Sequence, residues 1–381
     1  LRASSDVFEV RAGHLAFDEA ETATFLKERF GVDLDRSVVR PLRARTEGWP
    51  AGLQLAGISL ERAVDRGAFV ERFAGDDRNV ADYLTGEVLS SVGAEREEFL
   101  LRTSVLDELT GPLCDAVAQH SGSAAVIDGL ERDGLFVIPL DHQRRWYRYH
   151  HLFRDWLRHE LHATGHGLIP DLHRRASGWH AEHGSMDAAI DHAFEIPDTD
   201  LAAALIAREL GAWERVHWPR VWRWIDQLPD DVIKRHPPVA LARSRLAFET
   251  GQFGRGLAWA DAAEAGLDSL PPQLRDVMAI RLKLWHALAH LTDGDMAAAL
   301  DLALEVADQE RPKRSPDYAG AIGLAGMTTF WLVGALESIA QLTEGSAARA
   351  DAGLEDGGVT PLLALAHAEV GDWSAASSTA E

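Results

Sequence analysis

Histidine is the residue type in this sequence that is best suited to chemistry, because neutral imidazole nitrogens bind zinc and related metals. The sequence contains 17 histidines. Two groups have helical spacing: His159, His162 and His166, and the pair His286 and His290. Neither group has a neighbouring cysteine or carboxylate that completes a convincing ligand set. We therefore predict no metal site, and a histidine–metal hydrolase stays an alternative that stoichiometric zinc in the purified protein would support.

Motifs for phosphate binding and hydrolysis are absent from the sequence. A phosphate-binding loop needs G-x-x-x-x-G-K-[ST], and dinucleotide binding uses G-x-G-x-x-G, but neither occurs. The G-x-S-x-G and H-E-x-x-H motifs of serine hydrolases and zinc proteases are also missing. We therefore expect no enzyme activity, no catalytic residues and no cofactor for this chain alone.

Cysteine and tryptophan are better explained by packing than by chemistry. The single cysteine, Cys114, cannot form an internal disulfide, so we predict a small core residue. Four tryptophans lie close together in the sequence: Trp213, Trp218, Trp222 and Trp224. Such a cluster can line a ligand pocket, but its helical spacing favours packing in the core where the repeats begin.

The overall composition is that of a globular chain that avoids nucleic acid. The 381 residues are 46% hydrophobic and carry a formal net charge of −22, which repels a phosphate backbone. No apolar run approaches the roughly 20 residues of a membrane-spanning helix, and no signal peptide begins the sequence. We therefore expect a cytoplasmic protein with no membrane and no direct nucleic-acid partner.

The first part of the sequence predicts a small helical domain at residues 18–92. Asp18 and Glu21 have the spacing of a capping box, and Gly31 is a suitable stop for that helix. A second helix should run to about Arg45, and Pro50 suits the first turn of the next helix. Residues 1–17 resemble the tail of a larger domain, in which four apolar residues alternate as in a strand: Phe8, Val10, Leu15 and Phe17.

Residues 93–168 have the order of a winged-helix domain, in which three helices precede a hairpin and a last helix. Thr110 and Ser123 are predicted helix caps, and Gly134 ends the third helix. The apolar strands LFVIPL and RWYRYH flank the polar turn at residues 141–144. A helix with the sequence LFRDWLRHEL closes the domain.

The charge of this domain argues against a DNA-reading role. The helix that would enter the major groove carries Asp128, Glu131 and Asp133 against Arg132 alone. The wing carries three arginines for which acidic neighbours or a phosphate are better partners: Arg144, Arg145 and Arg148.

Residues 169–381 predict an array of helical hairpins similar to tetratricopeptide repeats. Alanine-rich helices flank turn glycines at Gly184, Gly251, Gly294 and Gly371. Gly251 and Gly294 lie 43 residues apart, and a further 77 residues separate Gly294 from Gly371, which is close to two more repeats. The sequence ends in mid-repeat. The whole fold is therefore predicted as mostly α, with a helical bundle, a winged helix and a repeat superhelix; an ordinary alanine-rich bundle is the alternative for the last part.

Several segments, in the same order, resemble the large MalT-like, LuxR-type regulators of the STAND class of signal-transducing ATPases. They are TEGWPAGLQLAGISL, FLLRTSVLDELTGPLCDAV, LERDGLFVIPLD, WYRYHHLFRDWLRHEL and LHRRASGWHAEHGSMDAAIDHA. The resemblance implies a nucleoside-triphosphatase domain before this region and a helix-turn-helix after it, so the complete gene should encode a phosphate-binding loop before Leu1 and a DNA reader beyond Glu381. It also implies that ADP holds a closed monomer, and that inducer with ATP opens it to self-associate and activate transcription.

The same resemblance nominates nucleotide-contacting residues. GWPAGL is similar to the element that packs against adenine, which implies Pro50 with Gly48 and Trp49 beside it; a plain helix start is the alternative. YHHLFRDWL is similar to the segment whose histidine meets the β-phosphate of ADP, which implies His150. A histidine that only satisfies backbone groups is the alternative there. ATP and ADP are thus expected as cofactors of the full-length protein.

The expected function is that of a regulatory and sensor region. Its expected partners are an unknown inducer on the superhelix, either a small molecule or a protein, and further copies of the full-length protein. The alternative function is a stand-alone tetratricopeptide-like scaffold that binds a protein partner and never meets nucleotide.

Overall fold

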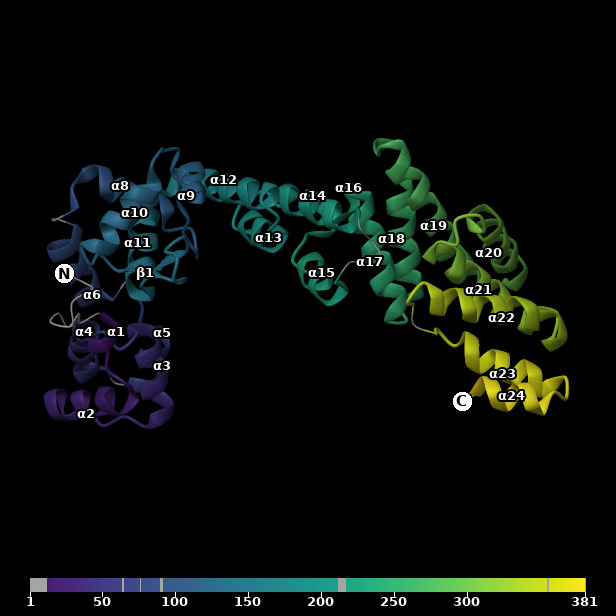
Figure 1. Cartoon of the computed structure of the whole chain (residues 1–381), viewed down its shortest axis with the longest axis horizontal. Coiled ribbons are helices and arrows are strands. Elements are labelled where there is room, and N and C mark those ends of the chain that lie inside the picture. Colours follow the sequence, from purple (N-terminus) through teal and green to yellow (C-terminus); the bar gives the residue numbers. More distant parts are fainter. Residues whose placement is uncertain are drawn as a thin grey trace. The chain divides into compact units, whose positions relative to one another are not determined.

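The computed structural model describes residues 12–63, 65–75, 77–89, 92–211, 217–354 and 356–380. These residues are mostly helical, with one two-stranded sheet, and they divide into two compact units, Leu1–Pro197 and Asp198–Glu381 (Figure 1). The predicted fold, mostly α with one β-hairpin, is confirmed. In the described part of the chain, no helix has the length and apolar character needed to cross a membrane.

The first unit begins with short helices whose ends follow the predicted signals. The capping box is formed, because Asp18 Oδ1 accepts from the Glu21 amide at 2.8 Å and Glu21 Oε2 accepts from the Asp18 amide at 2.9 Å. Gly31 ends this helix with φ +65°, as predicted. The helices are α1 (Ala12–Leu15), α2 (Glu19–Phe30), α3 (Arg36–Thr46), α4 (Pro50–Arg62), α5 (Arg66–Arg72), α6 (Arg78–Tyr83) and the π-helix η1 (Leu84–Leu89).

The predicted strand-like start of the chain is partly wrong. Leu15 lies in helix α1, and Phe17 follows it outside any strand. Phe17 donates its amide to the Gly48 carbonyl at 2.8 Å, a single contact that builds no ladder. Phe8 and Val10 lie outside the described residues.

The winged helix has the predicted order of elements. Its strands pair antiparallel with Val137 opposite Tyr149 and Pro139 opposite Tyr147. Thr110 caps α9 as predicted, since its Oγ1 accepts from the Leu113 amide at 3.3 Å. The elements are α8 (Ala94–Thr103), α9 (Gly111–Ala118), α10 (Ser123–Arg132), β1 (Val137–Pro139), β2 (Tyr147–Tyr149) and α11 (His151–Thr164).

One predicted cap is wrong by a residue. Gly122, with φ +86°, stands at the cap position of α10, and Ser123 is the first helical residue. The Ser123 amide donates to Asp115 Oδ1 at 2.9 Å, so a side chain from α9 satisfies the start of α10. This partner is eight residues away in sequence, outside the local pattern on which the prediction rested.

A single apolar core joins the small helical domain to the winged helix. It runs from Leu26 in α2 through Leu53 in α4 to Trp156 in α11, all three fully buried. Cys114 belongs to this core, and burial raises the pKa of its thiol to about 12. The prediction of Cys114 as a core residue is confirmed.

The acidic residues of α10, and Asp133 directly after it, are paired within the domain. Glu131 lies 3.2 Å from Arg144 of the wing, and Asp133 lies 2.7 Å from Arg96 of α8. Asp128 accepts from the Tyr147 hydroxyl at 2.8 Å. Acidic partners for the wing arginines are thus confirmed at Arg144, and at Arg148 as described below.

Paired helices follow the winged helix and continue through the second unit. The first unit ends with η2 (His166–Leu168), α12 (Ile169–Glu182) and α13 (Met186–Phe194). The second unit contains α14 (Asp200–Glu209), α15 (Trp218–Ile225), α16 (Asp230–Arg235), α17 (Pro237–Glu249), α18 (Phe253–Ala265), η4 (Leu267–Ser269), α19 (Pro272–Thr292), α20 (Met296–Glu310), α21 (Pro316–Leu332), α22 (Ala335–Asp351), α23 (Val359–Glu369) and α24 (Trp373–Ala380).

The turn glycines have the predicted positive φ and mark equivalent positions. The values are +84° at Gly184, +73° at Gly251, +86° at Gly294 and +84° at Gly371, and Gly334 supplies a further turn at +147°. The repeat extends to side chains. Ser177 stands seven residues before Gly184 and donates to the Ala189 carbonyl at 2.7 Å. Ser244 stands seven before Gly251 and donates to the Gly256 carbonyl at 2.8 Å.

The tryptophans of the second unit divide between core and surface. Trp224 is 1% exposed, which confirms the packing prediction for this residue. Trp218 and Trp222 are half-buried, their rings 4.6 Å apart, and the Arg245 guanidinium lies 4.0 Å from the Trp218 ring. Trp213 lies outside the described residues.

Candidate functional site

The segment between α3 and α4 brings the first group of predicted site residues to the surface of the winged helix. Glu47 and Gly48 have φ of +51° and +72°, which turn the chain sharply after Thr46. A Cβ on Gly48 would lie 2.2 Å from the Phe17 carbonyl oxygen, so only glycine fits there. Pro50 is the first residue of α4, where its missing N–H costs nothing, as predicted.

His150 lies at the junction of β2 and α11 and faces that segment. Its side chain is buried, with 7% exposed, and its Nε2 lies 3.0 Å from the Thr46 carbonyl oxygen. Because a carbonyl oxygen only accepts, Nε2 carries the proton and donates it. Nδ1 is buried without a hydrogen-bond partner among the described residues. Burial lowers the pKa of His150, and the charge of Glu47 opposes that shift.

Aromatic rings join the two predicted groups. The Trp49 ring lies 5.8 Å from the His150 ring and 4.9 Å from the Phe136 ring, both edge to face. The Tyr83 ring lies 5.7 Å from the Trp49 ring. Residues about 100 positions apart in sequence thus form one site, which contains the predicted Gly48, Trp49 and His150, with Pro50 next in the chain.

Glu47 is the residue that sequence reasoning missed. Its carboxylate accepts two hydrogen bonds from Arg148, at 2.7 and 2.8 Å, and one from the His151 amide at 3.0 Å. Burial opposes its ionisation, but the Arg148 hydrogen bonds, the charge of His150 and the His151 amide together hold its pKa at about 2. No local pattern in the sequence indicates this pair, because its members lie 101 residues apart.

The predicted histidine groups are not brought together as metal ligands. His159, His162 and His166 are exposed, with the His162 and His166 rings 5.8 Å apart. His286 and His290 contact different carboxylates: His286 Nε2 lies 3.5 Å from Asp261, and His290 Nδ1 lies 3.7 Å from Asp295.

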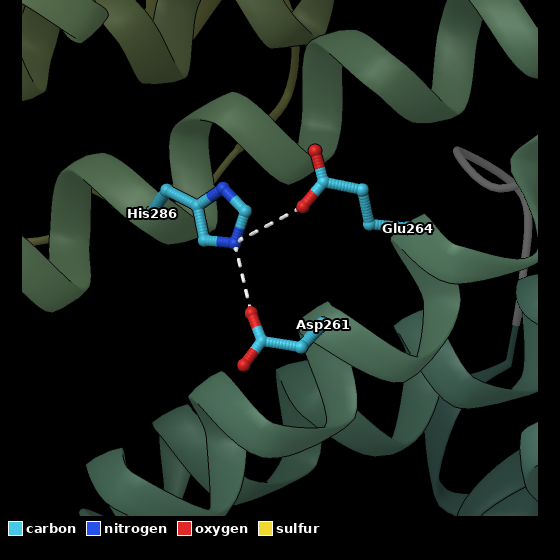
Figure 2. Close-up of side chains that lie close together, drawn as sticks. All are labelled: Asp261, Glu264 and His286. Carbon is cyan, nitrogen blue, oxygen red and sulfur yellow. Dashed lines mark ion pairs between the residues drawn. The ribbon is translucent and has the colours of Figure 1, made fainter.

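The statement that no carboxylate accompanies His286 is wrong. Asp261 and Glu264 of α18 lie 3.5 and 3.9 Å from His286 Nε2 on α19 (Figure 2). Among the described residues, these three have ligand atoms within 4.8 Å of one another. The sequence reasoning considered neighbours along one helix, whereas these carboxylates come from the preceding helix of the array.

Comparison with known proteins agrees with this architecture. Residues 85–169 match the MalT winged helix domain. The chain is 32% identical over 274 residues to the HTH-type transcriptional regulator MalT of Vibrio campbellii, covering 68% of this chain and 30% of that protein. It is 30% identical over 310 residues to the serine/threonine-protein kinase PknK of Mycobacterium tuberculosis, covering 81% of this chain and 26% of the kinase.

A solved structure has the same fold. It is a STAND protein with a tetratricopeptide repeat sensor from Pyrococcus horikoshii, with a TM-score of 0.52, 12% identity, and coverage of 96% of this chain and 53% of that one. The resemblance to MalT-like proteins is confirmed, and the fold is similar to that of a STAND protein. The matched residues 85–169 overlap the predicted winged-helix domain at 93–168; the three predicted domain boundaries stay predictions.

Proposed function

We propose that this chain is the regulatory and sensor region of a MalT-like, ATP-dependent transcription regulator. The similarity to MalT proteins and the STAND-type fold support this role. The site around His150 would close on nucleotide that is held by a separate ATPase domain of the full-length protein. The helical repeats would bind the inducer, either a small molecule or a protein, and self-association of the full-length protein would follow.

Nucleotide chemistry belongs to the full-length protein in this proposal. The sequence lacks a phosphate-binding loop, so the chain alone hydrolyses no ATP and needs no cofactor. The two relatives have different outputs by name, a transcriptional regulator and a protein kinase. A region that a transcriptional regulator and a protein kinase share is better suited to regulating the protein than to binding DNA or transferring phosphate.

The observation that carries the proposal is the contact between the Trp49 and His150 rings, together with a buried Nδ1 of His150 that has no hydrogen-bond partner in the described part of the chain. A buried polar atom without a partner is costly, and a ligand that pairs with it removes this cost. Pro50 and Trp49 supply an apolar surface suited to a flat base. These features fit a nucleotide better than they fit a purely structural junction.

The geometry also defines what His150 must do. Its Nε2 proton is engaged by Thr46, and neutral Nδ1 only accepts, so a phosphate oxygen finds no free donor. His150 would therefore release Thr46 or take a second proton at Nδ1. Bound nucleotide supplies negative phosphate charge, which favours the protonated imidazole. In the first case His150 would exchange its contact with Thr46 for a contact with nucleotide, and in the second it would keep both contacts.

The test is an ADP titration of a longer form of the protein that includes a nucleotide-binding domain. We expect His150→Ala to weaken ADP binding at least about tenfold, since a hydrogen bond to a charged group contributes about 1.5–3 kcal/mol. His159→Ala is the matched control, because that imidazole is exposed on the same helix, α11; it should change affinity less than about threefold. Unchanged affinity in His150→Ala contradicts the proposed contact.

A further inference from the structure

Two carboxylates and an imidazole converge on one point of the helical array, in the second unit and apart from the His150 site. Asp261 and Glu264 lie three residues apart on α18, so they share one face of that helix, and His286 faces them from α19 (Figure 2). His286 Nε2 lies 3.5 Å from Asp261 Oδ1 and 3.9 Å from Glu264 Oε2. One ring nitrogen thus meets two oxygens, and the three ligand atoms lie within 4.8 Å of one another.

This group differs from the other contacts between histidine and carboxylate in the part of the chain that the structure describes. Each of the others joins an imidazole to a single carboxylate, and at Glu47 and Asp200 that carboxylate also pairs with an arginine. Asp261 and Glu264 form no ion pair with an arginine or lysine among the described residues. Even a protonated imidazole would offset one of their two charges, so the group keeps a net negative charge.

The chemistry of the three ligands favours a transition metal over Mg²⁺ or Ca²⁺. Imidazole together with carboxylates binds Zn²⁺ and related ions, whereas Mg²⁺ and Ca²⁺ prefer oxygen ligands alone. Zinc bonds of about 2.0–2.2 Å place two ligand atoms of a tetrahedral shell about 3.3–3.6 Å apart. The contact between His286 and Asp261 already has this length, and the contact between His286 and Glu264 needs to shorten only slightly.

The burial of the side chains is consistent with this adjustment. The imidazole of His286 is 23% exposed, so the surrounding helices restrict its position, whereas the side chains of Asp261 and Glu264 are 64% and 57% exposed. Exposed carboxylates are free to rotate toward an ion, and little desolvation opposes their binding to it. The group therefore combines one restricted ligand with two adaptable ones.

We propose that Asp261, Glu264 and His286 bind a divalent transition metal of the zinc type. Three protein ligands leave the fourth position of a tetrahedral shell for water. The metal would join α18, the second helix of one hairpin, to α19, the first helix of the next. Contacts between neighbouring repeats supply part of the stability of such arrays, so the metal would stabilise this interface. The proposal does not rest on the nucleotide-dependent function.

Zinc titration of the chelator-treated chain by calorimetry tests the proposal. We expect one equivalent that binds at least about tenfold more tightly than any further zinc, because three ligands act together on one ion. His286→Gln removes the imidazole, and Asp261→Asn replaces a charged ligand with a neutral amide, so each should weaken this equivalent at least about tenfold. Circular dichroism checks that both variants fold, as expected for changes at side chains that reach the surface.

His290→Gln is the matched control, because His290 lies one turn further along α19 and contacts a single carboxylate, that of Asp295. It should bind zinc as the wild type does. The proposal is overturned if the wild type has no such tight equivalent, if His286→Gln or Asp261→Asn keeps wild-type affinity, or if His290→Gln loses the equivalent.

Competition with Mg²⁺ separates the proposed site from two carboxylates that attract any cation. A large excess of Mg²⁺ should leave the tight zinc equivalent of the wild type in place, because Mg²⁺ gains little from imidazole. Displacement of that zinc by Mg²⁺ would show that the carboxylates alone hold the ion, and would reject His286 as a ligand.

Discussion

At the scale of single residues, the junction between the small helical domain and the winged helix depends on Glu47. Its side chain is 18% exposed and that of Arg148 is 26% exposed, so solvent screens this pair only partly. The pair also fixes the loop that presents Trp49 to His150. Glu47 and Trp49, on either side of Gly48, therefore do more than begin a helix: Glu47 pairs with Arg148, and Trp49 contacts His150.

Substitution Glu47→Gln should lower the free energy of unfolding of the first unit by about 2 kcal/mol, because Arg148 loses a charged, bidentate partner. Urea denaturation at pH 7 measures this. Glu98→Gln is the control, since its partner Arg102 forms an exposed i,i+4 pair; the expected loss is below about 0.5 kcal/mol. Equal effects would show that Glu47 acts only as a surface charge.

The same pair predicts a pH dependence. The folded pKa of Glu47, about 2, lies below its ordinary value of 4.5, so ionised Glu47 stabilises the folded state above pH 4.5. This contribution is lost as the pH falls from about 4.5 to about 2. The difference in unfolding free energy between wild type and Glu47→Gln should therefore shrink over that range. A difference that stays constant with pH would contradict the assignment.

At the scale of elements, the helical hairpins repeat a small set of local solutions. A glycine in the left-handed region ends the first helix, and a serine seven residues earlier bonds to the facing helix in two hairpins. In the α19–α20 hairpin the equivalent position is Ala287, which is fully buried. The α19–α20 hairpin thus keeps a small, buried residue at this position but lacks the serine hydroxyl.

Two alanine substitutions in the α12–α13 hairpin should have opposite effects. Gly184 has φ +84° and open space around a Cβ, so Gly184→Ala should cost about 1–2 kcal/mol from backbone strain alone. Gly178 lies inside α12, also with open space, so Gly178→Ala should stabilise by about 0.5–1 kcal/mol. Urea denaturation of both variants measures this. Effects of the same sign would refute the assigned turn.

At the scale of the whole molecule, net charge bears on which classes of partner are favoured. Its formal net charge is −22, and the helix that would enter a major groove pairs Glu131 and Asp133 with arginines of its own domain. Those arginines are therefore engaged within the protein. We therefore expect the winged helix to make contacts within the protein and not with DNA.

We expect no binding of duplex DNA by this chain at physiological salt, even at the concentrations of roughly 10⁻⁴–10⁻⁶ M where non-specific binders associate. Fluorescence anisotropy of a labelled duplex measures this, and a basic DNA-binding protein serves as the positive control for the assay. Saturable binding that weakens steeply with added salt would disprove the prediction and reveal a basic surface that the sequence conceals.

The sequence by itself determined the elements that depend on local interactions. The capping box at Asp18, the proline start at Pro50 and the positive φ of Gly251 are decided by residues within a few positions, so a single sequence reveals them. The order of the elements and the family motifs then indicated the winged helix and the repeats. The exception at Ser123 arose because its partner, Asp115, belongs to another helix.

Only the tertiary structure decided which side chains meet across distant segments. Glu47 with Arg148, His173 with His192, and His286 with Asp261 each join different elements, and no periodicity relates their positions. The tautomer of His150 likewise follows from Thr46, which lies 104 residues away. Charge and hydrogen-bond partners depend on distances in space, and these are set by the packing of the core. The sequence thus indicated that His150 and Pro50 are candidate site residues. The fold decided which ring nitrogen of His150 carries the proton and which side chains pair around the site.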